Sequence, residues 1–308
     1  MTARHHHFLS QCYLKGFTAG KSKKSKLVVI DTKGKSFETT PRNVGGVRDF
    51  NRIEIDGVDP NSIETELSKF EGQAALALKK LRDTLDFSGE TKDVLLNLMA
   101  LLGVRSPERR EHMRKFQAGI AEKIIEMSLE SKERWEGQAR KLDKNSATAN
   151  KVSYEEVKEF FDSKKYTIDV TREHHIRMEM VQLEAILPCL YHRKWILLVA
   201  NDKSGPFITT DRPLNLYWKE PSKIHPFNRA SPGFGLRGTE VYFPVSQDIA
   251  LIGDFDEQEQ TLIANERLVA LFNSKMLWNL NCQIYAPKFD FKFLGKNNEV
   301  LSGKSLVR

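Results

Sequence analysis

The sequence predicts an α+β protein in which N- and C-terminal strands form a mostly antiparallel sheet and a helical middle packs against it. Short β-rich segments separated by turn residues fill residues 1–60 and 191–308. Residues 61–190 instead carry apolar side chains at helical spacing. One further long helix is expected near the C-terminus. Strands at both ends of a chain pair most simply with one another, so we expect a single domain over residues 1–308.

The first sixty residues predict strands and turns. Residues 26–30 are apolar and β-branched enough to form a strand, and Asp31-Thr32-Lys33-Gly34 has the composition of a tight turn. Residues 35–40 would then return as the second strand. Further turn signals follow at Pro41, Gly45-Gly46 and Asp56-Gly57.

Five helices are predicted in the middle of the chain. The first begins near residue 61, and the third near Ser106, with Pro107 as its first helical residue. The apolar stripe of this third helix is Met113, Phe116, Ile120, Ile124 and Met127. The other helices are expected at residues 91–102, 154–161 and 171–188, and a polar loop at 144–148. His175 and Glu179 lie four apart in the last of them, which predicts an exposed contact.

The strand pattern returns in the last third of the chain. Strands are predicted at residues 194–200, 207–210, 239–244, 249–252 and 283–285. Residues 219–238 hold three prolines and three glycines, which predicts a long surface loop of the kind that often carries function. A helix is expected over residues 258–275, and a polar tail ends the chain.

Composition and charge restrict the class of protein. Of the 308 residues, 40% are hydrophobic and 29% charged, and no apolar run is long enough to span a bilayer. The start lacks the layout of a secretory signal, so we expect a cytoplasmic protein without membrane association. The scattered Cys12, Cys189 and Cys282 predict reduced thiols. A net charge of +7 favours a polyanionic partner such as nucleic acid, although many basic proteins bind none.

A phosphate-binding loop is absent. The segment Gly16–Ser22 places three residues between its first two glycines, where the motif requires four. A lysine-rich segment follows in place of a helix start, so we expect no nucleotide cofactor. Residues 21–26 could contact nucleic-acid phosphates or form a solvated turn.

The run His5-His6-His7 could bind a metal ion, act in acid–base catalysis or have a structural role. If these residues lie on a strand, neighbouring side chains point to opposite faces and only His5 and His7 could share one ion, whereas an irregular N-terminus would remove this restriction. A divalent metal such as Mg²⁺ or Mn²⁺ would then need ligands from elsewhere, with His7 and Asp211 as the predicted pair. A histidine can also act as a general acid or base, since its pKa lies near neutrality. The alternative is a hydrogen-bonded pair that fixes the N-terminal strand.

Arginines gather at the predicted start of the third helix. Arg105, Arg109 and Arg110, together with the helix-start amides, would make a phosphate clamp. Pairing with Glu108 and Glu111 is the alternative explanation.

A carboxylate directly follows a predicted strand in Thr209-Thr210-Asp211-Arg212-Pro213. This position suits a ligand or a general base, with Arg212 beside it for substrate binding. The alternative is an aspartate that bonds the backbone and shapes the turn.

One N-terminal segment has a specific pattern, His6-His7-Phe8-Leu9-Ser10-Gln11-Cys12-Tyr13-Leu14-Lys15-Gly16-Phe17. It resembles the opening of domain-of-unknown-function family 4238, mainly bacterial proteins that begin His-His-aromatic-aliphatic-Pro-Gln-x-Tyr-Leu-Arg-x-Phe. Ser10 and Lys15 depart from that pattern. Further matches are Glu64 to Glu71, Arg105 to Arg110, Trp195, Phe207 to Pro213, and Phe243-Pro244. The resemblance implies that the polar positions with a role are His6, His7, Glu64, Glu71, Arg105, Arg110 and Asp211.

The leading hypothesis is a hydrolase of a phosphate-containing substrate, with RNA or DNA as the expected substrate and a toxin or defence effector as the role suggested by analogy. Histidine and carboxylate groups would act as acid and base or hold a metal, and arginines would bind phosphate. The alternative is a non-catalytic module that binds nucleic acid or protein, with stacking on Tyr217, Trp218 and Phe234 and a structural histidine pair. A third hypothesis is an enzyme that acts on a small molecule. The sequence does not predict the oligomeric state.

Overall fold

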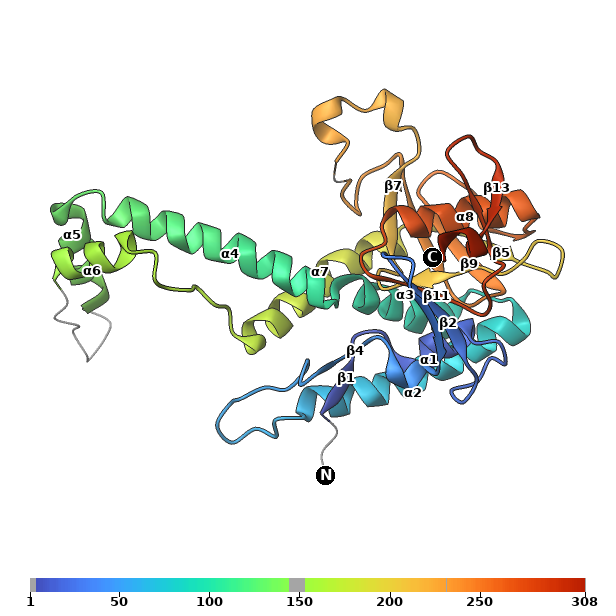
Figure 1. The fold of residues 1–308 in the computed structure, drawn as a ribbon, viewed down its shortest axis with the longest axis horizontal. Helices are drawn as coiled ribbons and strands as arrows, with labels where there is room; N and C mark the ends of the chain where they lie inside the picture. Colours follow the sequence, from blue (N-terminus) through green and yellow to red (C-terminus); the bar gives the residue numbers. More distant parts are fainter. Residues whose placement is uncertain (1–3, 144–152, 231, 308) are drawn as a thin grey trace. The chain divides into compact units, whose positions relative to one another are not determined.

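The computed structural model describes residues 4–143, 153–230 and 232–307 (Figure 1). The chain divides into two compact units. The first comprises Met1–Glu108 and Ile176–Arg308, and the second comprises Arg109–His175. The α+β class is confirmed, while a single domain over residues 1–308 stays a prediction. The loop expected at 144–148 lies outside the described residues.

A four-stranded antiparallel sheet joins the two ends of the chain. Its strand order is β3 (Ser36–Thr39), β2 (Leu27–Asp31), β11 (Gln283–Ala286) and β6 (Thr209–Thr210). Ile30 of β2 lies opposite Ile284 of β11, so the predicted pairing of N- and C-terminal strands is confirmed. The turn between β2 and β3 forms as expected, because the Asp31 carboxylate accepts the Lys33 N–H and Gly34 has a φ of 82°.

A second, five-stranded sheet contains C-terminal strands only. Its order is β10 (Gln260–Ile263), β5 (Lys194–Val199), β9 (Ile249–Asp254), β8 (Thr239–Pro244) and β7 (Asn215–Trp218). All neighbours are antiparallel except β10 and β5. The expected single sheet is therefore two larger sheets. The predicted helix over 258–275 is wrong at its start, since β10 precedes α8 (Glu266–Trp278), which Asn265 caps by accepting the Leu268 N–H.

Smaller elements complete the first unit. Two strand pairs form, β1 (His5–His7) with β4 (Gly46–Arg48) and β12 (Lys292–Leu294) with β13 (Val300–Ser302). The helices are α1 (Gln11–Leu14), α2 (Ser62–Thr84) and α3 (Gly89–Val104), with α7 (Arg172–Tyr191) entering from the second unit. Short 3-10 helices occupy Lys15–Phe17, Pro41–Asn43, Pro221–Lys223, Pro226–Asn228 and Gly303–Leu306. The pair β12–β13 lies in the segment for which the sequence indicated only a tail.

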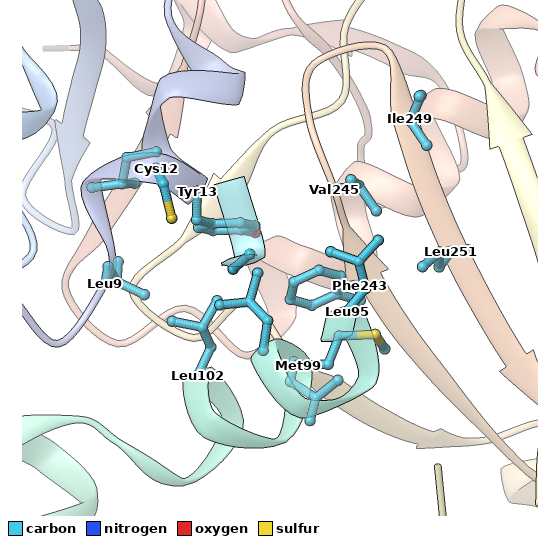
Figure 2. Packing of buried hydrophobic residues seen from close by; sticks show 14 of the residues in the cluster. Leu9, Cys12, Tyr13, Leu95, Met99, Leu102, Phe243, Val245, Ile249 and Leu251 are labelled. Carbon is cyan, nitrogen blue, oxygen red and sulfur yellow. The ribbon is translucent and has the colours of Figure 1, made fainter. Parts of the chain in front are cut away.

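The main core lies where the N-terminal segment meets α3 and the five-stranded sheet. Figure 2 shows Leu9 and Tyr13 in one cluster with Met99 of α3 and Phe243 of β8, and the Tyr13 and Phe243 ring centroids lie 5.4 Å apart. The Tyr13 hydroxyl donates to Pro244 O at 2.8 Å and lies 2.8 Å from Thr209 Oγ1. One buried tyrosine therefore ties α1 to a strand end of each large sheet, and this fixes the position of β1 just before it.

The second unit is helical. It contains α4 (Pro107–Ser128), whose first two residues belong to the first unit, α5 (Lys132–Asp143) and α6 (Tyr154–Asp162), with α5 and α6 in contact (Figure 1). The sequence did not predict α5. Ser153 and Glu156 form a capping box at the start of α6. No helix in the described part of the chain is long and apolar enough to cross a membrane.

Candidate functional site

The three N-terminal histidines lie on β1 and alternate as predicted. His5 and His7 share one face, with ring centroids 5.0 Å apart, and His6 points the other way into the protein with no exposed surface. Gly46 of β4 makes this arrangement possible, because a side chain there would collide with the His5 ring. Gly45 is in the left-handed region at φ +66° and turns the chain so that its carbonyl accepts the Phe8 N–H at 2.8 Å.

Asn51 is the centre of the polar cluster behind β1. Its backbone N–H donates to His6 Nδ1 at 2.9 Å, and its amide Nδ2 donates to Glu64 Oε2 at 2.6 Å. Its Oδ1 accepts a hydrogen bond from Arg105 Nη2 at 3.2 Å. Asn51 is 1% exposed. Through its backbone N–H and its side-chain amide, Asn51 therefore joins three side chains that the family resemblance singled out.

The tautomer of His6 follows from these bonds. Because Nδ1 accepts the Asn51 N–H, the proton of the neutral ring lies on Nε2. Glu64 Oε2 lies 4.0 Å from the same Nδ1 and is bonded to the Asn51 amide instead. His6 is thus a fully buried group that positions Asn51.

Arg105 connects the histidine strand to the end of α3. Its guanidinium Nη2 donates to the His7 carbonyl at 2.9 Å as well as to Asn51, and its Cζ lies 6.0 Å from the Phe50 ring centre. The residue is buried. A fixed positive charge therefore lies inside the cluster, near Glu64 and Glu71 of α2.

Glu71 of α2 and His7 have shifted pKa values. Burial raises the pKa of Glu71, the charge of Glu64 raises it further, and the charge of Arg105 opposes both. Burial lowers the pKa of His7, with the bond from its Nε2 to Arg42 O working in the other direction. Glu64 affects the pKa values of both Glu71 and His7, so these groups lie within electrostatic reach of one another.

A pocket of about 220 Å³ opens beside Asn51 and Arg105. Its walls are mostly apolar side chains of α2 and α7, namely Ile63, Leu67, Ile176 and Met180, and two carboxylates also line it, Glu66 and Glu179. Glu179 is 5% exposed, so our expectation that it makes an exposed contact is wrong. The pocket gives the cluster a concave neighbour of the size that suits part of a small ligand.

The comparisons with known proteins identify the family. A family model described as protein of unknown function (DUF4238) matches residues 5–288. The chain belongs to this family. No curated protein and no solved structure matches it. The DUF4238 description states no activity, so the roles of the residues must be argued from the geometry.

Asp211, which the family resemblance also singled out, lies in a different environment from the cluster around Asn51. Its carboxylate accepts the backbone N–H groups of Asn281 at 3.2 Å and of Cys282 at 2.6 Å, and the residue is 7% exposed. Burial raises its pKa, while these amides lower it. These are the bonds of an aspartate that shapes a turn, and they tie the end of β6 to the start of β11.

The contacts of the described residues do not test the predicted arginine clamp or metal pair. Arg212 donates to Glu108 at 2.8 Å and to Asn279 at 2.9 Å, while Arg109 and Arg110 belong to the second unit. Within the described residues, no group of three or more His, Cys, Asp or Glu side chains is arranged to hold a metal ion. A substrate role for these arginines and an ion held by His7 and Asp211 stay predictions.

Sequence reasoning missed Asn51. It lies in a short irregular segment between β4 and α2, with no periodic pattern or motif around it. A buried hub of this kind is recognised only when the partners of its backbone and amide groups are known. The resemblance came nearest, because it named Glu64 and Arg105, which Asn51 joins.

Proposed function

We propose that this DUF4238 protein hydrolyses a phosphate-containing substrate, with nucleic acid as the substrate class. The observation that carries the proposal is that Asn51 bonds both Glu64 and Arg105, that Arg105 also bonds the His7 backbone carbonyl, and that Glu71 lies within electrostatic reach of Glu64 and Arg105. These residues come from β1, from two positions on α2 and from the end of α3. Acid–base cleavage of a phosphodiester needs such a set, namely a proton acceptor, a proton donor and a cation.

The two glutamates would take different roles in acid–base chemistry. Glu71 has a raised pKa, so it holds a proton more readily and would act as the general acid. The Glu64 side chain is 31% exposed and accepts a hydrogen bond from Asn51, so it is oriented, within reach of solvent, and would act as the general base.

The remaining groups supply charge and order. Arg105 would stabilise the negative charge that develops on the phosphate, and His7, whose pKa is lowered by burial, would provide a neutral imidazole that can accept a proton. His6 would position Asn51, since it has no exposed surface through which to touch a substrate. The net charge of +7 favours the approach of a polyanion.

Incubation with labelled tRNA, single-stranded DNA and duplex DNA tests the proposal, with magnesium, manganese or EDTA as separate arms. Cleavage by the wild type that is lost in Glu64→Gln and His7→Gln, while the circular dichroism of both variants is unchanged, supports it. Cleavage that survives both substitutions contradicts it. Asp211→Asn separates this site from a metal pair with His7, because cleavage should persist in that variant if Asp211 only shapes its turn.

A second function is favoured by one observation. His6 and Arg105 have hydrogen-bond partners within the chain, as a structural role for the histidine strand requires. A non-catalytic module that binds nucleic acid would show a gel shift that weakens steeply with salt, and no cleavage in any arm.

The proposed biological role is that of a toxin or defence effector. Induced expression of the wild type in a bacterial host should then arrest growth, and expression of Glu64→Gln should not. Equal growth of both strains at equal protein levels would remove this part of the proposal.

A further inference from the structure

An apolar face of α4 is largely exposed in the described part of the chain, with Met113 half-buried at one end. It comprises the residues that we name the α4 seam, Met113, Phe116, Ile120, Ile124 and Met127. Phe116 is 60% exposed, Ile124 57% and Met127 54%, and Ile120 at the centre is 46% exposed. Single exposed apolar residues are ordinary, but a contiguous row along four helical turns marks an interaction surface.

The contacts of α4 within the second unit lie mostly beside and behind the α4 seam. Gln117 Nε2 lies 2.8 Å from His174 Nε2, and the Glu122 carboxylate accepts hydrogen bonds from Lys164 Nζ at 2.9 Å and from the Tyr166 hydroxyl at 3.1 Å. Arg114 donates to Ile168 O at 3.4 Å. Successive residues of an α-helix turn by about 100°, so Arg114 and Glu122 point away from the α4 seam, whereas Gln117 lies along its edge.

The spacing of the α4 seam is a palindrome. Its five residues are separated by three, four, four and three positions, so the order is the same from either end. Spacings of three and four are those of a helix seam that packs against another helix. When two such seams run antiparallel about a two-fold axis at Ile120, Phe116 faces Ile124 of the second copy, and Met113 faces Met127.

We propose that the α4 seam is a homodimer interface in which two copies of this chain pair their α4 helices antiparallel. The palindrome favours a second copy over an unrelated partner, since self-complementarity is required only of a surface that meets itself. Exposed fractions near one half at Phe116, Ile120, Ile124 and Met127 give roughly 100 Å² per side chain, or about 800 Å² for two seams. With the stems of flanking side chains, that area suits a specific but weak dimer.

Sedimentation velocity of the full chain tests the proposal, with circular dichroism as the folding control. The wild type should be dimeric at about 50 μM and dissociate on dilution. Ile120→Asp places two carboxylates against each other at the axis, so its dimer dissociation constant should rise at least about 100-fold. Ile124→Ser is the milder second variant, and Leu76→Asp on α2, where the leucine is 71% exposed, is the matched control that should stay dimeric.

A paired substitution tests the antiparallel register. Phe116→Asp and Ile124→Lys should each weaken the dimer, and the double variant should restore it, because each aspartate then faces a lysine of the other copy. A parallel pair would place like charges together and stay monomeric. A wild type that is monomeric to about 500 μM, a dimer that Ile120→Asp and Ile124→Ser leave intact, or a double variant that fails to recover would each overturn the proposal.

Discussion

Replacement of Asn51 by alanine should destabilise the protein far more than loss of one asparagine usually does. The substitution removes the 2.6 Å bond to the Glu64 carboxylate and the 3.2 Å bond from Arg105, and both partners are charged. The Glu64 side chain is 31% exposed and can rebond to water, whereas Arg105 is 3% exposed and cannot. Taking about 1 kcal/mol for the first bond and about 2 kcal/mol for the second gives a loss near 3 kcal/mol.

Urea denaturation followed by circular dichroism measures this loss. The matched control is Asn43→Ala, which removes one exposed amide bond to Thr39 and should change the free energy of unfolding by less than about 0.5 kcal/mol. A loss in Asn51→Ala no larger than in Asn43→Ala would refute the view that Asn51 joins the cluster. The His6 ring should keep its Nε2 proton in the variant, since the bond to Nδ1 comes from the backbone.

Three further predictions concern stability. Tyr13→Phe removes the buried hydroxyl bonded to Thr209 and Pro244, and thermal melting should show a loss of about 1–3 kcal/mol. The fully buried guanidinium of Arg193 donates four hydrogen bonds, and a lysine cannot replace them. Arg193→Lys should therefore lower the unfolding midpoint more than the same substitution at any exposed arginine. Burial raises the pKa of Glu71 in the folded state, so the folded protein holds that proton more tightly than the unfolded chain and its stability falls as pH rises from the ordinary glutamate pKa through the raised value. Urea titrations across that range should show a flatter profile in Glu71→Gln.

Local patterns predicted the elements well where one physical cause dominates. The turn at Asp31–Gly34 and the start of α4 at Pro107 follow from backbone preferences of single residues. The region around residue 260 failed because helical spacing of apolar residues in the following helix was extended too far back. There, β10 pairs with β5 through backbone hydrogen bonds, and its residues are exposed. Such an edge strand carries little apolar pattern, so its partner decides its structure.

The candidate site was predictable only in part. The alternation of His5, His6 and His7 followed from strand geometry, and the resemblance selected Glu64 and Arg105. The role of Asn51, which joins Glu64 and Arg105, was not predictable. It depends on hydrogen bonds to residues far away in the sequence, and these leave no local pattern. Asp211 was indicated by its place after a strand, and the structure shows it bonded to backbone amides.

The most direct test of the acid–base proposal is the single-turnover rate of RNA cleavage by the wild type, Glu71→Gln and Glu38→Gln at equal concentrations of folded protein. Glu38 is an exposed glutamate on β3 and serves as the matched control. The proposal predicts a rate in Glu71→Gln that is lower by about 100-fold or more, and a rate in Glu38→Gln within about twofold of the wild type. Equal rates in all three proteins, or no cleavage by the folded wild type, would contradict it.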